Sequence, residues 1–415
     1  MEQLTIKVYL WGLLVGLLKW DNEAGRSRFS FSEEYLDSHL EISPVLYPKA
    51  KVRRREFFGN RNLEGLPEFL ADSLPDDWGN TLFDKWTSDH QIPSNDARAL
   101  YKLSFIGSRG MGAFEFIPSV PQDDTDNESI VVEDLYRQAM YILKDREEVQ
   151  LTAAEHKTLS KIISLGTSIG GKHAKGLIAI NPEGDIRSGQ ISLPDEYKYY
   201  VLKFNEERDV PSCEVEKVFY DMALEAGIPM MPSQLYPVEG VNHFLTERFD
   251  RKPGGEKVFS QTLRALSSGG KDYMNLFWLC ETLHIPAIQR EHLFRQMVFN
   301  FFAGVSDDHS RNFSFLMDKD GNWSLAPAYD VMFTSNTWKD SSAHVHSLAV
   351  WGKNSHLTAE DFVDFGEDLE ITNCKSIIKE VSDSIRTFPE KCKTYDISSR
   401  WRVMIWGVIH GFLPK

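Results

Sequence analysis

The sequence predicts an α+β fold with a β-rich N-terminal subdomain, a second β-rich lobe and a helical C-terminal lobe. Polar and apolar residues alternate at 5–10 and 27–31, the period of strands with two different faces. Helical periodicity dominates from about residue 274 onward. With 42% hydrophobic and 12% aromatic residues, the 415-residue chain has enough apolar side chains for a large core.

The apolar run at 8–20, VYLWGLLVGLLKW, resembles a targeting signal but lacks a basic segment before it and a small-residue cleavage site after it. It is also too short to span a bilayer. We therefore expect two short strands joined by a tight turn near Gly12, and no membrane association. The four cysteines lie far apart without a CxxC pair, which favours a reducing, cytoplasmic location over a disulfide framework or a zinc site.

Farther along, residues 103–116 are typical of a strand, a Gly-rich turn and a second strand. The polar, turn-rich segment PQDDTDNE at 121–128 is the best linker candidate. We expect three domains: an N-terminal subdomain at 1–118, a lobe with a Gly-rich loop at 129–250, and a helical lobe at 251–415.

Two helical patterns near 131–144 and 152–165 precede strand-like runs at 177–180 and 199–204. A helix is expected at 213–226, with Ser212 as its N-cap and Gly227 just beyond its C-terminus, and a strand at 243–249. A β-rich lobe with one helix, followed by a helical lobe, is the layout of a bilobal protein-kinase-like fold. ATP would then bind between the lobes, since ligand sites favour domain interfaces.

The irregular segment at 305–335 has the residues that phosphoryl transfer requires. Asp307 and Asn312 have the spacing of a protein-kinase catalytic loop, in which Asp is the base and Asn a magnesium ligand. Asp330 follows a proline turn, where kinases place a second magnesium-binding Asp. An Asp and an Asn five residues apart are often found in plain surface loops, but the second Asp in the same segment favours the catalytic interpretation.

Phosphoryl transfer also needs a cation on the phosphates, and Lys203 in the strand YYVLKF is the candidate. A lone strand lysine often faces solvent. Glu216, at the edge of the apolar face of the next helix, would complete a kinase-like Lys–Glu ion pair. The alternative for Glu216 is an ordinary carboxylate at the boundary of a helix face.

The Gly-rich segment GTSIGGKH at 166–173 differs from a Walker A motif at one residue, His173. Walker A requires a strand before the loop and a helix after it, whereas the predicted order here is reversed. Glycine backbones still let N–H groups approach phosphates closely, and Lys172 and Lys175 add positive charge. The alternative is a plain hairpin turn.

The formal net charge of −15 opposes direct binding to nucleic acid, which depends on Lys and Arg contacts with phosphates. Any contact with DNA is expected to run through a basic partner.

Taken together, these motifs resemble the HipA family of toxin–antitoxin Ser/Thr protein kinases over nearly the whole chain. The N-terminal resemblance lies in Gly65-Leu66-Pro67, in the run from Asp72 to Gly79, and in Gly110-Met111-Gly112-Ala113. In the C-terminal part it lies in the loop at Ser168, in Glu-Arg-Phe-Asp-Arg at 247–251, in 307–312, and in Pro327-Ala328-Tyr329-Asp330.

The resemblance implies the remaining roles. Asp307 would be the catalytic base, Asn312 and Asp330 would bind Mg²⁺, and Ser168 would be autophosphorylated. The neighbouring Thr167 is either a second acceptor or a turn hydroxyl bonded to its own backbone, and both alternatives stay open. The partners would be a helix-turn-helix antitoxin, with DNA bound only through it, and a protein substrate such as an aminoacyl-tRNA synthetase. ATP would be bound by Gly170, Gly171, Lys172, His173, Ala174, Lys175, Lys203, Glu247, Arg248, Phe249, His309, Ser310, Arg311, Asn312, Tyr329 and Asp330.

The sequence departs from the family in two places. Lys172 and His173 follow the loop glycines where members often have Gln or Glu, and the stretch 258–263 only partly matches the family's acidic-aromatic segment. Two alternatives to a kinase stay open: a metal-dependent hydrolase using Asp307, Asp308 and His309, and a kinase-shaped module that only binds a partner.

Overall fold

The computed structural model describes residues 4–52, 55–89, 97–119, 128–144, 173–268, 270–334 and 345–414. The chain forms two compact units. The first comprises Met1–Glu206, Tyr236–Gln261 and Met317–Asn322, and the second comprises Glu207–Leu235, Thr262–Leu316 and Trp323–Lys415. The fold is α+β, as predicted, with helices and antiparallel sheets. The three-domain division stays a prediction.

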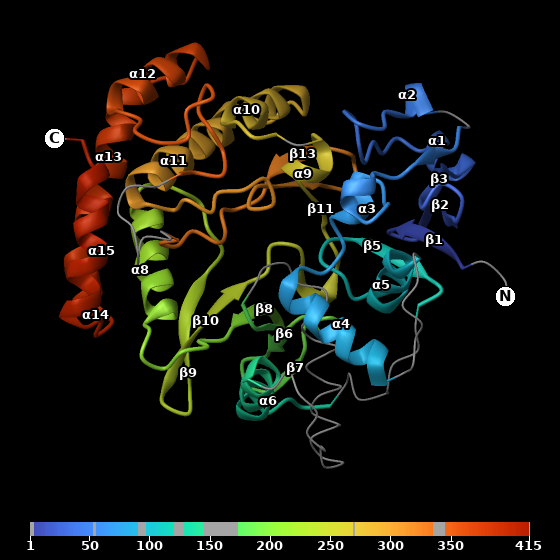
Figure 1. Ribbon diagram of the computed structural model, residues 1–415, viewed down its shortest axis with the longest axis horizontal. Helices are drawn as coiled ribbons and strands as arrows, with labels where there is room; N and C mark the ends of the chain where they lie inside the picture. The colour runs from blue at the N-terminus through green and yellow to red at the C-terminus, as the bar shows by residue number, and fades with distance from the viewer. Residues whose placement is uncertain are drawn as a thin grey trace. The chain divides into compact units, whose positions relative to one another are not determined.

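The N-terminal sheet has the strand order β4-β3-β2-β1-β5 and contains the predicted hairpin (Figure 1). Trp11 and Gly12 both have positive φ and form the tight turn between β1 and β2. Alternation places Ile6, Val8 and Leu10 in the core. The strands are β1 Thr5–Leu10, β2 Leu13–Asp21, β3 Arg26–Phe31, β4 Phe57–Phe58 and β5 Phe114–Ile117.

One sequence-based expectation here is wrong. Residues 103–106 belong to a helix, α5 Arg98–Ile106, and not to a strand. Seven of its nine residues are buried, so the short apolar run lacks the exposed face that distinguishes helix from strand. Gly107, with φ +57°, ends the helix and donates its N–H to the Leu103 carbonyl.

The second sheet has the order β7-β6-β8-β10-β9, and in it β8 pairs with both β6 and β10. The strand-like runs at 177–180, 199–204 and 243–249 are confirmed as β6, β8 and β10. Its strands are β6 Lys175–Ile180, β7 Ile186–Ser188, β8 Lys198–Lys203, β9 Ser233–Val238 and β10 Val241–Glu247. A third sheet has the order β11-β12-β13, with β11 Phe259–Thr262, β12 Ser314–Met317 and β13 Trp323–Leu325.

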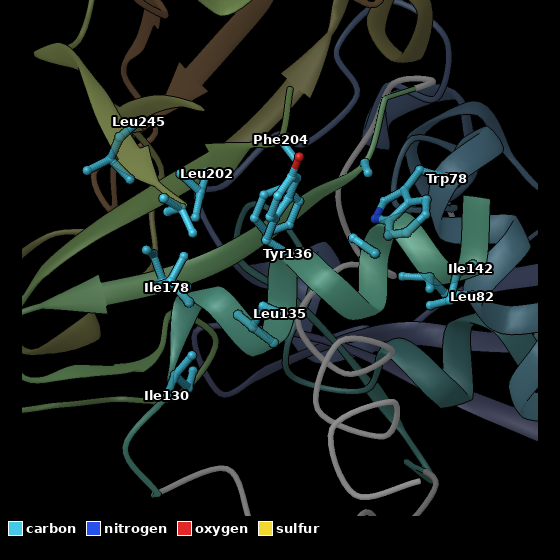
Figure 2. Packing of buried hydrophobic residues seen from close by; sticks show 14 of the residues in the cluster. Trp78, Leu82, Ile130, Leu135, Tyr136, Ile142, Ile178, Leu202, Phe204 and Leu245 are labelled. Carbon is cyan, nitrogen blue, oxygen red and sulfur yellow. The ribbon is translucent and has the colours of Figure 1, made fainter. Parts of the chain in front are cut away.

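Helices α4 Asp77–Asp89 and α6 Val132–Lys144 cover one face of the second sheet. Figure 2 shows Ile178 and Leu202 pointing from the strands toward Leu135 and Tyr136 of α6, within one buried cluster. The Trp78 indole in α4 also donates a hydrogen bond of 3.0 Å to the Lys175 carbonyl. This helix therefore anchors the beginning of β6 at Lys175.

The second unit is mainly helical. Helix α11 packs against α13 and α15, and α8 packs against α13 and α14. Helix α8 begins at Ser212 with Pro211 as its N-cap, one residue earlier than predicted, and Gly227 follows its end with φ +75°. The helices are α8 Ser212–Glu225, α9 Leu263–Leu266, α10 Tyr273–Thr282, α11 Ala287–Ala303, α12 Ala359–Asp368, α13 Cys374–Arg386, α14 Phe388–Thr394 and α15 Ser399–Phe412.

Among the described residues, the first unit has five further short helices: α1 Glu33–Asp37, α2 Lys49–Val52, η1 Arg61–Leu63, α3 Glu68–Ala71 and η3 Pro253–Gly255. Across the ranges given above, no helix combines the length and the apolar character that a bilayer crossing requires.

Candidate active site

The loop at 306–312 follows helix α11, which ends at Gly304 with φ +72°. The side chain of Asp307 is half-exposed, and its backbone is held at two points. Its N–H donates to Thr334 Oγ1 at 2.9 Å, and its carbonyl accepts a bond of 2.8 Å from Asn312 Nδ2. A catalytic base requires an accessible carboxylate on a positioned backbone, and Asp307 meets both conditions.

Asn312 lies at the end of the same loop, and its backbone N–H donates to the His309 carbonyl at 2.8 Å. Because Nδ2 is occupied by the Asp307 carbonyl, the amide oxygen Oδ1 is the atom left for a metal ion. Carboxylate, amide and water oxygens are the ligands that Mg²⁺ prefers. The predicted pair of Asn312 and Asp330 therefore has donor atoms that suit Mg²⁺.

His309 lies within the same loop, with Nε2 4.0 Å from Asp307 Oδ1 and with nearly half of its side chain exposed. Its Nδ1 accepts a long bond of 3.3 Å from the Arg311 N–H. The Ser310 carbonyl accepts from the Arg264 N–H at 3.3 Å. Backbone bonds thus fix the shape of the loop, and the His309 ring is directed toward the candidate base.

Asp330 has φ +53°, in the left-handed region that few residues other than glycine adopt. Such strain is concentrated at functional sites, where the surrounding structure holds it. Just before it, the Ala328 N–H bonds to the Pro229 carbonyl at 2.8 Å, and Tyr329 Oη donates to the Arg311 carbonyl at 2.7 Å. Tyr329, predicted to contact ATP, here ties the Asp330 segment to the 306–312 loop.

In the first unit, antiparallel pairing places Lys175 of β6 directly opposite Lys203 of β8. Directly opposed residues share a face of the sheet. Since Ile178 and Leu202 pack against α6, alternation directs the side chains of Lys175 and Lys203 to the opposite face. Lys175 is buried, and Lys203 lies over the Phe244 ring with Nζ 5.8 Å from its centroid. Two cross-strand lysines on one face could together bind an anionic phosphate group.

Sequence reasoning missed Glu206, which holds the chain just before β6. Its carboxylate accepts the Ala174 N–H at 2.7 Å and lies 3.4 Å from His173 Nδ1. Burial raises the pKa of Glu206, but the bonds from His173 and Ala174 and the charge of Lys175 outweigh burial and lower that pKa. No motif in the sequence marks Glu206, which is one of two adjacent glutamates shortly after Lys203.

Within the Glu-Arg-Phe-Asp-Arg run at 247–251, Arg248 and Asp250 form a buried ion pair. Arg248 donates two bonds of 2.8 Å to Asp250 and one of 2.7 Å to the Gly189 carbonyl, and its side chain is fully buried. Burial raises the pKa of Asp250, but Arg248 and Arg251 outweigh it and lower the value. The Arg248 N–H also bonds to the Tyr199 carbonyl, which leaves Glu247 and Phe249 as the more accessible residues of the predicted adenine hinge.

The remaining predicted residues lie in different units or outside the described residues. Lys203 belongs to the first unit and Glu216 to the second, so their ion pair stays a prediction. Ser168, Thr167, Gly170, Gly171 and Lys172 lie outside the described residues. Within the described ranges, no group of three or more His, Cys, Asp or Glu side chains could hold a metal ion.

Sequence also missed the role of Asp308, whose side chain is buried. Its two carboxylate oxygens accept four hydrogen bonds, from Tyr273 Oη, from His346 Nδ1 and from the N–H groups of Ser347 and Leu348. A carboxylate engaged in this way is a poor metal ligand, and this geometry does not favour the hydrolase alternative.

Comparisons with known proteins show the family and the fold. Residues 6–117 match the family model of the HipA N-terminal domain, and residues 167–388 match that of the HipA-like C-terminal domain. The chain is 26% identical over 352 residues to a protein of Sinorhizobium fredii named "Putative kinase Y4mE", covering 80% of this chain and 77% of the relative. A Haemophilus influenzae protein named "Putative kinase" is 25% identical over 287 residues, covering 61% and 81%.

Among solved structures, the chain is similar to HipA of Shewanella oneidensis in its complex with HipB and operator DNA. The TM-score is 0.67 at 16% identity, and the match covers 98% of this chain and 96% of that one. At this identity the similarity establishes the fold alone.

Proposed function

The chain belongs to the HipA family, and on that premise we propose that it is an ATP-dependent Ser/Thr protein kinase that acts as the toxin of a toxin–antitoxin pair. The observation that carries the proposal is the Asp307–Asn312 loop. It combines a half-exposed carboxylate on an anchored backbone with an amide oxygen suited to Mg²⁺. Relatives named as kinases and the opposed lysines of β6 and β8 support it.

In the proposed reaction, Asp307 accepts the proton of a serine or threonine hydroxyl, and the hydroxyl oxygen attacks the γ-phosphorus of ATP. The bond between the γ-phosphorus and the β,γ-bridging oxygen breaks, and ADP leaves. Lys175 and Lys203 would bind the phosphates. Asn312 and Asp330 would hold Mg²⁺, which when bound neutralises phosphate charge. The remaining predicted ATP contacts, at 170–174, 247–249 and 309–311, belong to the same proposal.

The proposed partner is a small helix-turn-helix antitoxin, as the S. oneidensis HipA–HipB–DNA complex suggests. The net charge of −15 repels the phosphates of DNA, so the chain would need a basic partner to be held near DNA. The proposed target is a protein, and an aminoacyl-tRNA synthetase is one candidate by family resemblance.

The test is transfer of label from γ-³²P-ATP to protein in a bacterial extract, with and without Mg²⁺. We expect Mg²⁺-dependent labelling of a protein and growth arrest on expression, both relieved by the cognate antitoxin. Binding of ATP without any transfer would instead support the partner-binding module, and hydrolysis of simple esters without ATP would support the hydrolase.

A further inference from the structure

The aspartate next to the candidate base is buried at the centre of a hydrogen-bond network. Asp308 Oδ2 accepts from Tyr273 Oη at 2.8 Å and from His346 Nδ1 at 3.0 Å. Asp308 Oδ1 accepts from the N–H groups of Ser347 at 2.8 Å and Leu348 at 3.3 Å. A buried carboxylate is costly unless its lone pairs are satisfied, and four donors satisfy these.

The donors are themselves fixed in place. Tyr273, on α10, accepts a bond of 3.0 Å from Asn300 Nδ2 on α11, and burial beside Asp308 raises its pKa well above the usual value. The His346 ring stacks on Phe301 of α11, with centroids 3.7 Å apart and planes 17° apart. Because a carboxylate only accepts, His346 donates through Nδ1. Asp308 is thereby bonded directly to α10 and to the stretch at 346–348, and α11 supports both through Asn300 and Phe301.

The same stretch also bonds to the residue before the base. The Ser347 N–H and Oγ both reach the Ser306 carbonyl, at 3.1 Å and 3.3 Å. The N–H of the same peptide unit, at Asp307, donates to Thr334 Oγ1. The peptide unit before Asp307 is therefore held at its carbonyl by Ser347 and at its N–H by Thr334. The residue after Asp307 is held by the hydrogen bonds of the Asp308 side chain.

From this geometry we propose that Asp308 is a positioning residue for the base. Its carboxylate couples the 346–348 stretch and helices α10 and α11 to the backbone of Asp307, so that the loop keeps the orientation needed for proton acceptance. This inference rests on the proposed kinase function. It predicts that the hydrogen-bonding capacity of Asp308, not only its bulk, controls the rate of transfer.

The test compares Asp308→Asn with Tyr273→Phe, which removes a single donor and is the milder change. The control is Asp364→Asn, an exposed aspartate on α12. For Asp308→Asn we expect kcat to fall about 100-fold, the loss that a shift of about 1 Å in a catalytic group produces. For Tyr273→Phe we expect a fall of about tenfold, and in both variants the Kd for Mg²⁺-ATP should stay within about threefold of wild type.

Hydrogen exchange of peptides covering 304–312 and 345–350 gives a second readout that needs no activity. We expect faster exchange confined to these peptides in Asp308→Asn. Wild-type kcat in folded Asp308→Asn and Tyr273→Phe, or unchanged exchange at 304–312, would overturn the inference, as would a kcat loss explained entirely by the unfolded fraction. If the wild-type chain transfers no phosphate, the proposed function fails, and the exchange result alone decides whether Asp308 holds the loop.

Discussion

Lys175 and Lys203 are cross-strand neighbours on one face of the β6–β8 ladder. Two ammonium side chains on one face of a sheet offer two positive charges to the phosphates of ATP. We predict that Lys175→Met and Lys203→Met each weaken ATP binding about tenfold, the loss expected for one charged hydrogen bond. Titration calorimetry measures the affinity, with the exposed Lys19→Met as control.

Circular dichroism and thermal unfolding of the two unliganded variants check that both are folded, so that a loss of affinity can be assigned to the missing ammonium group. Wild-type ATP affinity in both variants would mean that these lysines have no role in binding phosphates.

At Asp330, one substitution removes the carboxylate charge and leaves the backbone conformation unchanged. Asn tolerates positive φ about as well as Asp, so Asp330→Asn should keep the fold while replacing a carboxylate ligand by a neutral amide. We predict an ATP affinity reduced about tenfold or more in Mg²⁺, and close to wild type in EDTA. Calorimetry in both buffers measures the difference. An equal loss in both would point to a structural role.

Ser168 is predicted to be phosphorylated by the enzyme itself, with loss of activity. A phosphate adds roughly −1.5 to −2 charges beside the glycines proposed to hold the ATP phosphates, where it would compete with ATP for backbone N–H groups and lysines. Mass spectrometry after incubation with Mg²⁺-ATP should locate the phosphate at residue 168, or at Thr167 in addition. Phospho-Ser168 protein that binds ATP as well as the unmodified protein would refute this mechanism.

His243 makes the first unit sensitive to acid. It is fully buried, its Nδ1 accepts the Asn205 N–H, and burial lowers its pKa from 6.5 to about 4. Between those values the unfolded chain binds a proton that the folded chain excludes, so stability is complete above pH 6.5 and falls as the pH drops toward 4. The expected loss is about 3 kcal/mol in the free energy of unfolding.

Urea unfolding at pH 7, 6 and 5 measures this loss, with His243→Gln as the comparison because glutamine keeps an acceptor but does not titrate. The variant should show a shallower pH dependence over this range. Equal slopes for the two proteins would show that His243 does not control the acid limb.

Much of the fold was predictable where the sequence has a clear period. The β1–β2 hairpin followed from alternation around Gly12, and α8 from its apolar face and Gly227. Helix α5 was not, since a short, almost wholly buried run has neither period.

The candidate site shows the same limit. Spacing singled out Asp307 and Asn312, but the adjacent aspartates 307 and 308 look alike in sequence. Only tertiary contacts from α10 and from 346–348 show that Asp307 is half-exposed and Asp308 is buried. Arg248 is likewise of a residue type that often binds phosphate, yet its side chain donates to Asp250 and to the Gly189 carbonyl.

The most direct measurement is single-turnover transfer of γ-phosphate from saturating Mg²⁺-ATP by wild type and by Asp307→Asn, with ATP affinity determined on the same samples. Asparagine keeps the shape of the side chain and the backbone bonds to Asn312 and Thr334, but cannot accept the hydroxyl proton. We predict a rate at least about 100-fold lower with nearly unchanged ATP affinity, as for removal of a general base. Transfer by Asp307→Asn at the wild-type rate would contradict the assignment of Asp307 as the catalytic base.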